Sequence, residues 1–277
     1  MNRLILHLGL TVLMSLLWAT RVAAQERPNP SLERPMLATV GLWTLGARPF
    51  PGSDDLEADF KLIISFRAPN EREWLVLPSD NGGPPLFKSE NFRFGPSFNI
   101  VGERKEADSR TVLKGLGSVD TAYEIGAFSE FWPLMWLRTR FEVRRGFEGH
   151  EGIVVNLASD AVWDATDQLR FTIGPRLSLA DDDYMQTYYG VNSRQAASSG
   201  LKKFDAGGGL ETASIGASVR YKFDEQWATL GYAEVGQLIG DAEKSPIVDR
   251  GSDTTVTVCA ALTYTFTFDR SQIPSLW

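Results

Sequence analysis

Residues 255–268 read TVTVCAALTYTFTF, an alternation of apolar with polar or small side chains over fourteen positions. One face carries Val256, Val258, Ala260, Leu262, Tyr264, Phe266 and Phe268, and the other carries Thr255, Thr257, Cys259, Ala261, Thr263, Thr265 and Thr267. Because successive side chains of a strand point to opposite faces, this period of two predicts a β-strand with one apolar face. Strands of soluble proteins typically have about 5–6 residues, whereas strands that cross a membrane need about 9–11.

The same alternation recurs along the chain. It is clearest over 60–67, 92–100, 137–144, 169–179 and 213–223, and further strands fit 37–46, 73–78, 120–130, 152–163 and 227–238. In a soluble sandwich the apolar faces would pack on each other. In a membrane barrel they would contact lipid, and the polar faces would line the lumen. Strand length favours the barrel, as do aromatic residues near the strand ends, namely Phe60, Phe66, Trp163, Tyr221, Phe223, Trp227, Tyr264 and Phe268.

The connections between these strands alternate in length over the C-terminal two thirds of the chain. Short links lie near 131–134, 164–167 and 224–226, and long ones near 103–118, 181–208 and 239–253. Outer-membrane barrels have short periplasmic turns, longer outer loops and an even number of strands. Eleven strands are clear, and residues 84–89 are the expected place of one more. The sequence therefore predicts an all-β fold, a single antiparallel transmembrane β-barrel of about 12 strands, with 10 as the alternative.

Two prolines fall inside predicted strands. Pro96 follows Gly95, and Pro175 follows Gly174. Proline removes a donor from the strand ladder and is usually found at bulges or edges. Both positions are therefore predicted to be β-bulges.

The N-terminus has the pattern of a secretory signal peptide. A charged start is followed by the apolar run LILHLGLTVLMSLLW at 4–18 and by Val22-Ala23-Ala24 before Gln25. Arg21 closes the apolar run, which argues against a membrane anchor. The predicted organisation is a cleaved signal peptide at 1–24, a flexible periplasmic leader at 25–36, an outer-membrane β-barrel at 37–268 and a C-terminal tail at 269–277.

Composition limits the classes of function. The chain has 277 residues, 43% of them hydrophobic, and a net charge of -7, which argues against both disorder and nucleic-acid binding. Removal of the signal takes away Arg3 and Arg21 but no acidic residue, so the net charge of the mature chain is -9. Cys259 is the only cysteine, so no intrachain disulfide can form.

Candidates for catalysis and metal binding are few. His150 is the only histidine after the signal, and it is read either as a loop residue in a glycine-rich turn or as the base of a barrel hydrolase. Asp181, Asp182 and Asp183 lack the ligand spacing of a calcium loop. The three glycines at 207–209 are not followed by the Lys-Ser/Thr of a phosphate loop. We expect no catalytic, cofactor-binding or metal-binding residues, and no cofactor.

The predicted inward faces carry basic residues that contrast with the acidic chain. This lumen-facing basic wall consists of Arg138, Arg140, Arg144, Arg170, Arg176, Arg220 and Lys222. One interpretation is a charge-paired, plugged interior in which Glu124, Glu142 and Asp160 are the partners. The other is a narrow pore that favours anions or polar solutes.

Several segments together resemble the MipA/OmpV family, named after the MltA-interacting protein. They are PGSDD at 51–55, LKGLG at 113–117, GH at 149–150, DYM at 183–185, TYYGV at 187–191, FDAGGGL at 204–210, GDA at 240–242 and SPIV at 245–248. No single segment is specific, but their order and spacing cover nearly the whole mature chain. The sequence departs from the family pattern at 68–90 and after Phe268.

The resemblance implies a bacterial outer-membrane location and contact with outer-membrane lipid. One family member is described as a scaffold that bridges a murein-degrading transglycosylase and a murein synthase. By resemblance, we therefore expect a non-enzymatic scaffold or docking protein with murein-processing enzymes as partners and no nucleic acid. The alternative is a narrow outer-membrane channel for small polar or anionic solutes.

Overall fold

The computed structural model describes residues 36–50, 52–53, 55–69, 71 and 73–268. The predicted signal peptide, the leader up to residue 35 and the tail 269–277 lie outside the described residues. The strands are β1 (Met36–Ala47), β2 (Glu57–Arg67), β3 (Phe87–Lys88), β4 (Phe92–Val101), β5 (Ala122–Leu134), β6 (Leu137–Glu148), β7 (Ile153–Asp164), β8 (Leu169–Ala180), β9 (Gly209–Lys222), β10 (Trp227–Leu238) and β11 (Thr254–Phe268).

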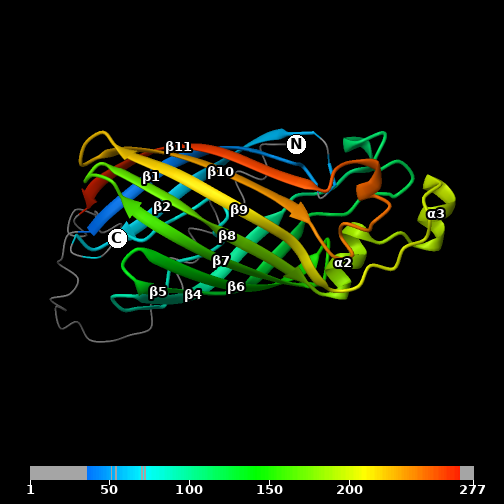
Figure 1. Cartoon of the computed structure of the whole chain (residues 1–277), viewed down its shortest axis with the longest axis horizontal. Helices are drawn as coiled ribbons and strands as arrows, with labels where there is room; N and C mark the ends of the chain where they lie inside the picture. The colour runs from blue at the N-terminus through cyan, green and yellow to red at the C-terminus, as the bar shows by residue number, and fades with distance from the viewer. Residues whose placement is uncertain (1–35, 51, 54, 70, 72, 269–277) are drawn as a thin grey trace, which may run out of the picture. The chain divides into compact units, whose positions relative to one another are not determined.

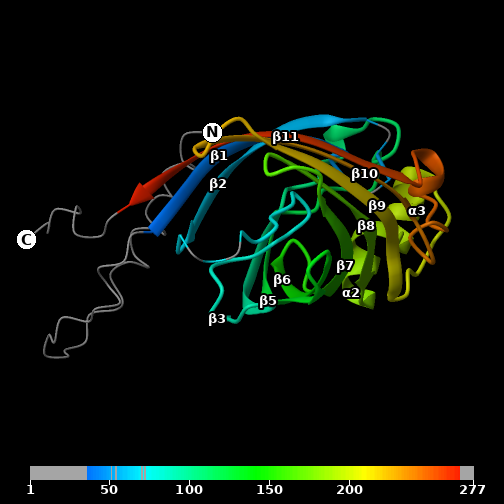
Figure 2. The same cartoon turned by 60° about the vertical axis from the view of Figure 1, so that its left-hand side comes forward.

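These strands form a single sheet in the order β2-β1-β11-β10-β9-β8-β7-β6-β5-β4-β3 (Figure 1). The first and last long strands are therefore neighbours: the Thr39 and Thr265 hydroxyls lie 2.8 Å apart, and Thr44 donates a hydrogen bond to the Ala260 carbonyl oxygen at 3.2 Å. The sheet curls so that β2 and β3 are its two edges (Figure 2). The predicted all-β antiparallel barrel is confirmed.

The strand count differs from the preferred prediction of twelve. The additional strand expected at 84–89 is present only as the two-residue β3. Residues 83–89 nevertheless follow the edge of β4, because the backbone N–H groups of Gly83, Leu86 and Ser89 donate to carbonyl oxygens of that strand at 2.7–2.9 Å. The other ten strands have 10 to 15 residues each, which matches the alternative count of ten.

The strand predicted at 73–78 is wrong. These residues form no β-ladder among the described residues and run inside the curled sheet. Their alternation has another cause: Leu75 and Leu77 are buried against inward side chains of the sheet, while Val76 between them is exposed. A period of two shows that one face is buried, and it does not show what covers that face.

The two predicted β-bulges are also wrong. The Pro96 carbonyl oxygen accepts a hydrogen bond from the Gly83 N–H, on the side of β4 that faces away from β5. The N–H that proline lacks would lie on this same side, so the ladder between β4 and β5 stays in register. At Pro175 the ladder to β7 is interrupted but resumes in the same register. The observed register shifts lie instead between Phe131 and Leu134 and between Ser178 and Leu179.

Burial in the sheet is inverted relative to a soluble protein. Large apolar side chains point outward, among them Leu62, which is 79% exposed, and Ile173, which is 56% exposed. Charged side chains point inward, and Arg138, Glu130 and Asp160 are fully buried. Lipid on the outside stabilises the first set, and ion pairing on the inside is required for the second.

Aromatic side chains gather where the strands end at the short turns. Trp163 stacks on Phe171 with ring centroids 5.7 Å apart, Tyr221 contacts Phe223 at 5.3 Å, and Trp227 contacts Tyr264 at 4.9 Å. Such rims mark the boundary between lipid and water in outer-membrane barrels.

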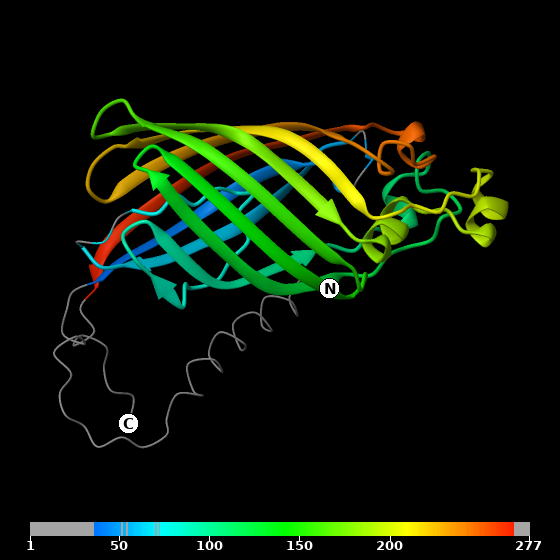
Figure 3. The same ribbon diagram turned by 60° about the horizontal axis from the view of Figure 1, so that its bottom comes forward.

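The long connections and the two α-helices of the described residues lie at the opposite end from the short turns (Figure 3). The helices are α2 (Asp182–Tyr189) and α3 (Ser193–Ser199), and neither was predicted. Met185, Tyr188 and Tyr189 of α2 pack with Leu238, and the connections around Leu113, Val191 and Ile247 form a second apolar cluster. The long loops therefore make an ordered cap. Among the described residues, no helix is long and apolar enough to cross a membrane.

An outward-facing position tests which solvent surrounds the sheet. Ile173 lies in mid-strand on β8 and is exposed, so Ile173→Arg would be tolerated in water. In lipid we expect a loss of roughly 2–4 kcal/mol in the free energy of unfolding, because arginine is costly near the bilayer midplane. Urea unfolding of the protein in phospholipid vesicles measures the loss, with Ile173→Leu as the control. Equal stability of the two variants would contradict an outward lipid face.

Candidate functional site

The predicted basic wall divides into buried and half-buried members. Arg138, Arg140, Arg144 and Arg176 are buried, whereas Arg170, Arg220 and Lys222 are half-buried. β6 supplies three of them because its residues 138, 140, 142 and 144 share the inward register. Glu142 lies between two of these arginines, so the strand carries both signs of charge.

Arg138 is the centre of the charged interior. Its guanidinium lies 2.8 Å from a carboxylate oxygen of Asp160, 2.9 Å from Glu130 and 2.7 Å from Asp80. The side chains of Arg138, Glu130 and Asp160 have no exposed surface. A buried charge of this kind is tolerated only when it is paired and hydrogen-bonded.

The network extends from this centre in both directions. Arg176 lies 2.6 Å from Asp160, and Arg140 lies 2.6 Å from Glu142. Arg144 contacts Glu142 at 2.5 Å and Glu124 at 2.8 Å. The structure thus brings the acidic residues Glu124, Glu142 and Asp160 to the arginines of the wall.

The remaining basic residues lie apart from this network. Arg170 pairs with Asp164 at 2.6 Å near the end of β7, where the carboxylate is more than half exposed. Arg220 and Lys222 of β9 both pair with Glu73. The seven residues therefore form three separate groups of ion pairs.

Residues 73–83, here called the inner segment, supply partners that sequence analysis missed. Asp80 accepts from Arg138, and the Asn81 carbonyl accepts from Arg140 at 2.7 Å. At the other end, Glu73 binds Arg220 and Lys222. Asp80 lies outside the strands that periodicity predicted, and Glu73 is the first residue of the segment 73–78, which was wrongly predicted as a strand. Glu130 was also missed, although it shares the inward register of Glu124 on β5 and was within reach of the pattern.

The inner segment also has an apolar side. Leu75 and Leu77 lie in one buried cluster with inward side chains of the sheet, which are Trp43, Trp132, Val162, Leu230, Tyr232, Cys259 and Ala261. The interior is therefore charged along β5 to β8 and largely apolar along β1, β10 and β11. The inner segment contacts both parts.

His150 is buried beneath the cap. Its Nε2 atom lies 3.2 Å from the Glu124 carboxylate, and its ring is edge-on to Tyr184 with centroids 4.9 Å apart. The ring fills the space that a side chain at residue 146 would take, since a Cβ on Gly146 would clash with the imidazole. His150 thus lies in the connection between β6 and β7, as predicted, but its side chain is packed into the interior.

Helix α2 is fixed over the outer end of the interior by polar contacts. Arg104 donates to the Tyr188 carbonyl oxygen at 2.9 Å, the Tyr189 hydroxyl donates to Glu211 at 2.8 Å, and Ser245 donates to the Tyr189 carbonyl oxygen at 2.6 Å. Burial raises the pKa of Tyr188 to about 12 and raises those of Tyr184 and Tyr189 further above their usual range. All three phenols therefore stay neutral at physiological pH.

Two of the three consecutive aspartates have structural contacts through their carboxylates. The Asp181 carboxylate accepts from the Tyr184 N–H at 3.1 Å and caps the N-terminus of α2. Asp182 accepts from the Gly208 N–H. In the part of the chain that the structure describes, no group of three or more His, Cys, Asp or Glu side chains is arranged to hold a metal ion.

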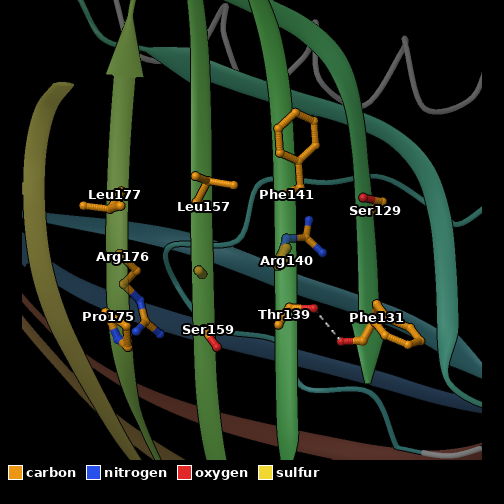
Figure 4. Close-up of a pocket in the computed structure, with 11 residues that line it drawn as sticks. Ser129, Phe131, Thr139, Arg140, Phe141, Leu157, Ser159, Pro175, Arg176 and Leu177 are labelled. Atoms are coloured by element: carbon orange, nitrogen blue, oxygen red, sulfur yellow. Dashed lines mark hydrogen bonds between the residues drawn. The ribbon is translucent and has the colours of Figure 1, made fainter. Parts of the chain in front are cut away.

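Two recesses lie outside the charged interior. One, of about 330 Å³, opens on the outward face of β5 to β8, where Phe131, Phe141, Leu157 and Leu177 surround the smaller Ser129, Ser159 and Pro175 (Figure 4). The other, of about 540 Å³, lies at the short-turn end and is lined by Arg67, Asp167, Lys222, Asp224 and Glu225 among others. The first faces the lipid layer, and the second faces water.

A protein-family model described as MltA-interacting protein MipA matches residues 40–266. Comparison with curated proteins gives no match. Among solved structures, a bacterial polysaccharide outer-membrane secretin is similar at 10% identity, with 85% of this chain and 99% of that chain covered and a TM-score of 0.39. The KdgM porin is similar at 11% identity, with 83% and 99% covered and a TM-score of 0.36. Both scores are low, so the fold assignment rests on this chain's own strand order and burial.

The buried network predicts unequal effects of two arginine substitutions. Arg138→Ala leaves Asp160, Glu130 and Asp80 without their shared cation, and we expect it to lower the free energy of unfolding by about 3–5 kcal/mol. Arg170→Ala removes a partly exposed pair and should cost at most about 1 kcal/mol. Urea unfolding in vesicles compares the two variants. Similar losses in both would mean that the interior network does not hold the fold.

The cap offers a separate test. In Arg104→Ala the buried Tyr188 carbonyl oxygen loses a charged donor, which is worth about 1.5–3 kcal/mol, so α2 should open at least roughly tenfold more often. Proteinase K cleavage within 181–208 measures this opening. Lys105→Ala changes the exposed neighbouring residue and should leave the cleavage rate unchanged. Equal rates in both variants would show that Arg104 does not hold the helix.

Proposed function

The chain belongs to the MipA family of outer-membrane β-barrel proteins, and from this membership we propose that it is a docking protein for murein-processing enzymes. The family model carries the description of an MltA-interacting protein, so the family is named after a binding partner. Because a barrel fold by itself hosts many functions, the match over residues 40–266 is the observation that carries the proposal.

A non-enzymatic role is supported by the surroundings of His150, the only histidine after the predicted signal peptide. Its side chain has no exposed surface, and Nε2 contacts the Glu124 carboxylate. The rings of Tyr184 and Tyr188 pack against it from α2. A general base has to come within hydrogen-bonding distance of the proton that it removes from a nucleophile or a substrate. Here the cap separates the imidazole from solvent, so a substrate outside the barrel does not reach it.

The short-turn end is the docking face that we propose. Outer-membrane barrels place their short turns in the periplasm, where murein lies. The charged recess at this end includes Asp167 in the turn before β8 and Glu225 in the turn before β10, and both are exposed. Two exposed carboxylates on neighbouring turns suit a basic patch on a periplasmic partner.

Reversing these two charges tests the docking face. In the variant Asp167→Lys with Glu225→Lys we expect at least a roughly tenfold loss of captured murein transglycosylase from envelope extracts, because like charges would oppose the basic partner. The matched control, Glu151→Lys with Glu243→Lys, makes the same change in net charge on exposed residues of the outer-end connections. It should capture the enzyme normally.

Two results would count against this proposal. If the wild-type protein captures no murein enzyme, the docking function is wrong. If both double variants capture the enzyme equally well, the short turns are not the docking face.

We propose a narrow channel for small anions as the second function. The observation that favours it is the set of arginines on the inward face of β6 and β8. In the described conformation these arginines are ion-paired, and the inner segment occupies part of the interior. Conduction would therefore require the inner segment to move.

A further inference from the structure

The charge balance of the interior depends on the inner segment. The ion pairs inside the sheet involve seven cations of the wall, which are Arg93, Arg138, Arg140, Arg144, Arg176, Arg220 and Lys222, and five carboxylates of the wall, which are Glu124, Glu130, Glu142, Asp160 and Glu234. The inner segment adds two carboxylates, Glu73 and Asp80. With the segment in place, the charges of these ion-paired groups are therefore balanced, and without it the seven cations exceed the five wall carboxylates by two.

The two carboxylates occupy sites that would suit a free anion. Asp80 lies between Arg138, at 2.7 Å, and Arg140, at 3.6 Å. Glu73 lies between Arg220 and Lys222, and these two cations have no other ion-pair partner among the described residues. Paired guanidinium and ammonium groups bind carboxylates and oxyanions through the same contacts.

The inner segment can leave the interior without breaking the sheet. It forms no β-ladder among the described residues. Its polar contacts to the wall come from the side chains of Glu73, Ser79 and Asp80 and from backbone groups of Leu75 and Asn81, and on the wall side all of them are made by side chains, which can separate from the segment without unpairing a strand. Its ends are fixed separately, at Arg67 of β2 and at Gly83, whose N–H donates to the Pro96 carbonyl oxygen at 2.8 Å. The fifteen residues between these points can span about 50 Å when extended, so the inner segment can move away from the wall while both of its ends stay attached.

We propose that the inner segment is a displaceable strap whose carboxylates hold the places of transported anions, and that its withdrawal opens an anion-selective path. The inference rests on the second proposed function and adds its gate and its ligand class, small oxyanions and carboxylates. With the strap in place, the paired charges and the apolar contacts of Leu75 and Leu77 close the path. With the strap withdrawn, Arg220 and Lys222 attract anions at the short-turn end, and Arg138 and Arg140 attract them further in.

Neutralising the strap without altering the wall tests the inference. In Glu73→Gln with Asp80→Asn, both side chains keep their shape but lose the charge that binds them. In planar bilayers with potassium chloride, we expect at least a roughly tenfold rise in open time over wild type, and a reversal potential in a salt gradient that reports chloride selectivity. Asp164→Asn neutralises a carboxylate that pairs with Arg170 near the strand end, and it should behave as wild type.

The single cysteine provides an independent readout. Cys259 is buried in the cluster that contains Leu75 and Leu77, so a membrane-impermeant maleimide should label it slowly in wild type. The neutralised strap should raise the labelling rate at least roughly tenfold. Heat-modifiable gel migration establishes that each variant is folded before either measurement.

A third variant, in which residues 73–82 are replaced by an equally long Gly/Ser sequence, distinguishes failure of the strap proposal from failure of the channel proposal. If this variant conducts anions but the neutralised strap stays closed and unlabelled, the charge-held strap is wrong and the channel function stands. If no folded variant conducts, both are wrong. Cation selectivity in any open variant, or wild-type conductance equal to that of the variants, would overturn the inference.

Discussion

The hydrocarbon layer of a membrane cannot form hydrogen bonds, and this constraint explains most of the structure. Every backbone N–H and C=O at membrane depth has to be paired within the wall, which favours long antiparallel strands joined edge to edge. The outward faces can then be apolar, as Leu62 and Ile173 are, and the polar side chains have to point inward. Arg138, Glu130 and Asp160 are consequently buried with no exposed surface, and they are stable there because each has a charged partner.

The inward charges connect stability with function. A buried ion pair adds little net stability, because desolvation offsets most of the attraction, but losing one partner is costly. The wall has more cations than carboxylates, and the inner segment supplies the missing carboxylates through Glu73 and Asp80. The same two residues therefore complete the packed interior and determine whether it can open.

The cap closes the outer end, where α2 packs on His150 and Arg104. The short-turn end carries the proposed docking face.

Sequence periodicity predicted the wall well because the alternation follows directly from the strand geometry. Ten of the eleven strands that it placed, such as 137–144 and 213–223, coincide with strands of the sheet. It failed at 73–78, where alternation reflects packing of Leu75 and Leu77 on the interior rather than pairing in the sheet. It also could not place Asp80 beside Arg138, since this contact depends on the path of an irregular segment across 58 positions of sequence. Helix α2 was missed because its residues were read as part of a long loop.

The inverted faces can be tested most directly by gel migration of the outer-membrane fraction with and without heating. A lipid-embedded sheet of paired strands resists detergent at room temperature, so the unheated protein should migrate faster than the heated protein, and it should be found with the outer membrane. Recovery of the protein in the soluble periplasmic fraction, with the same mobility before and after heating, would contradict the account.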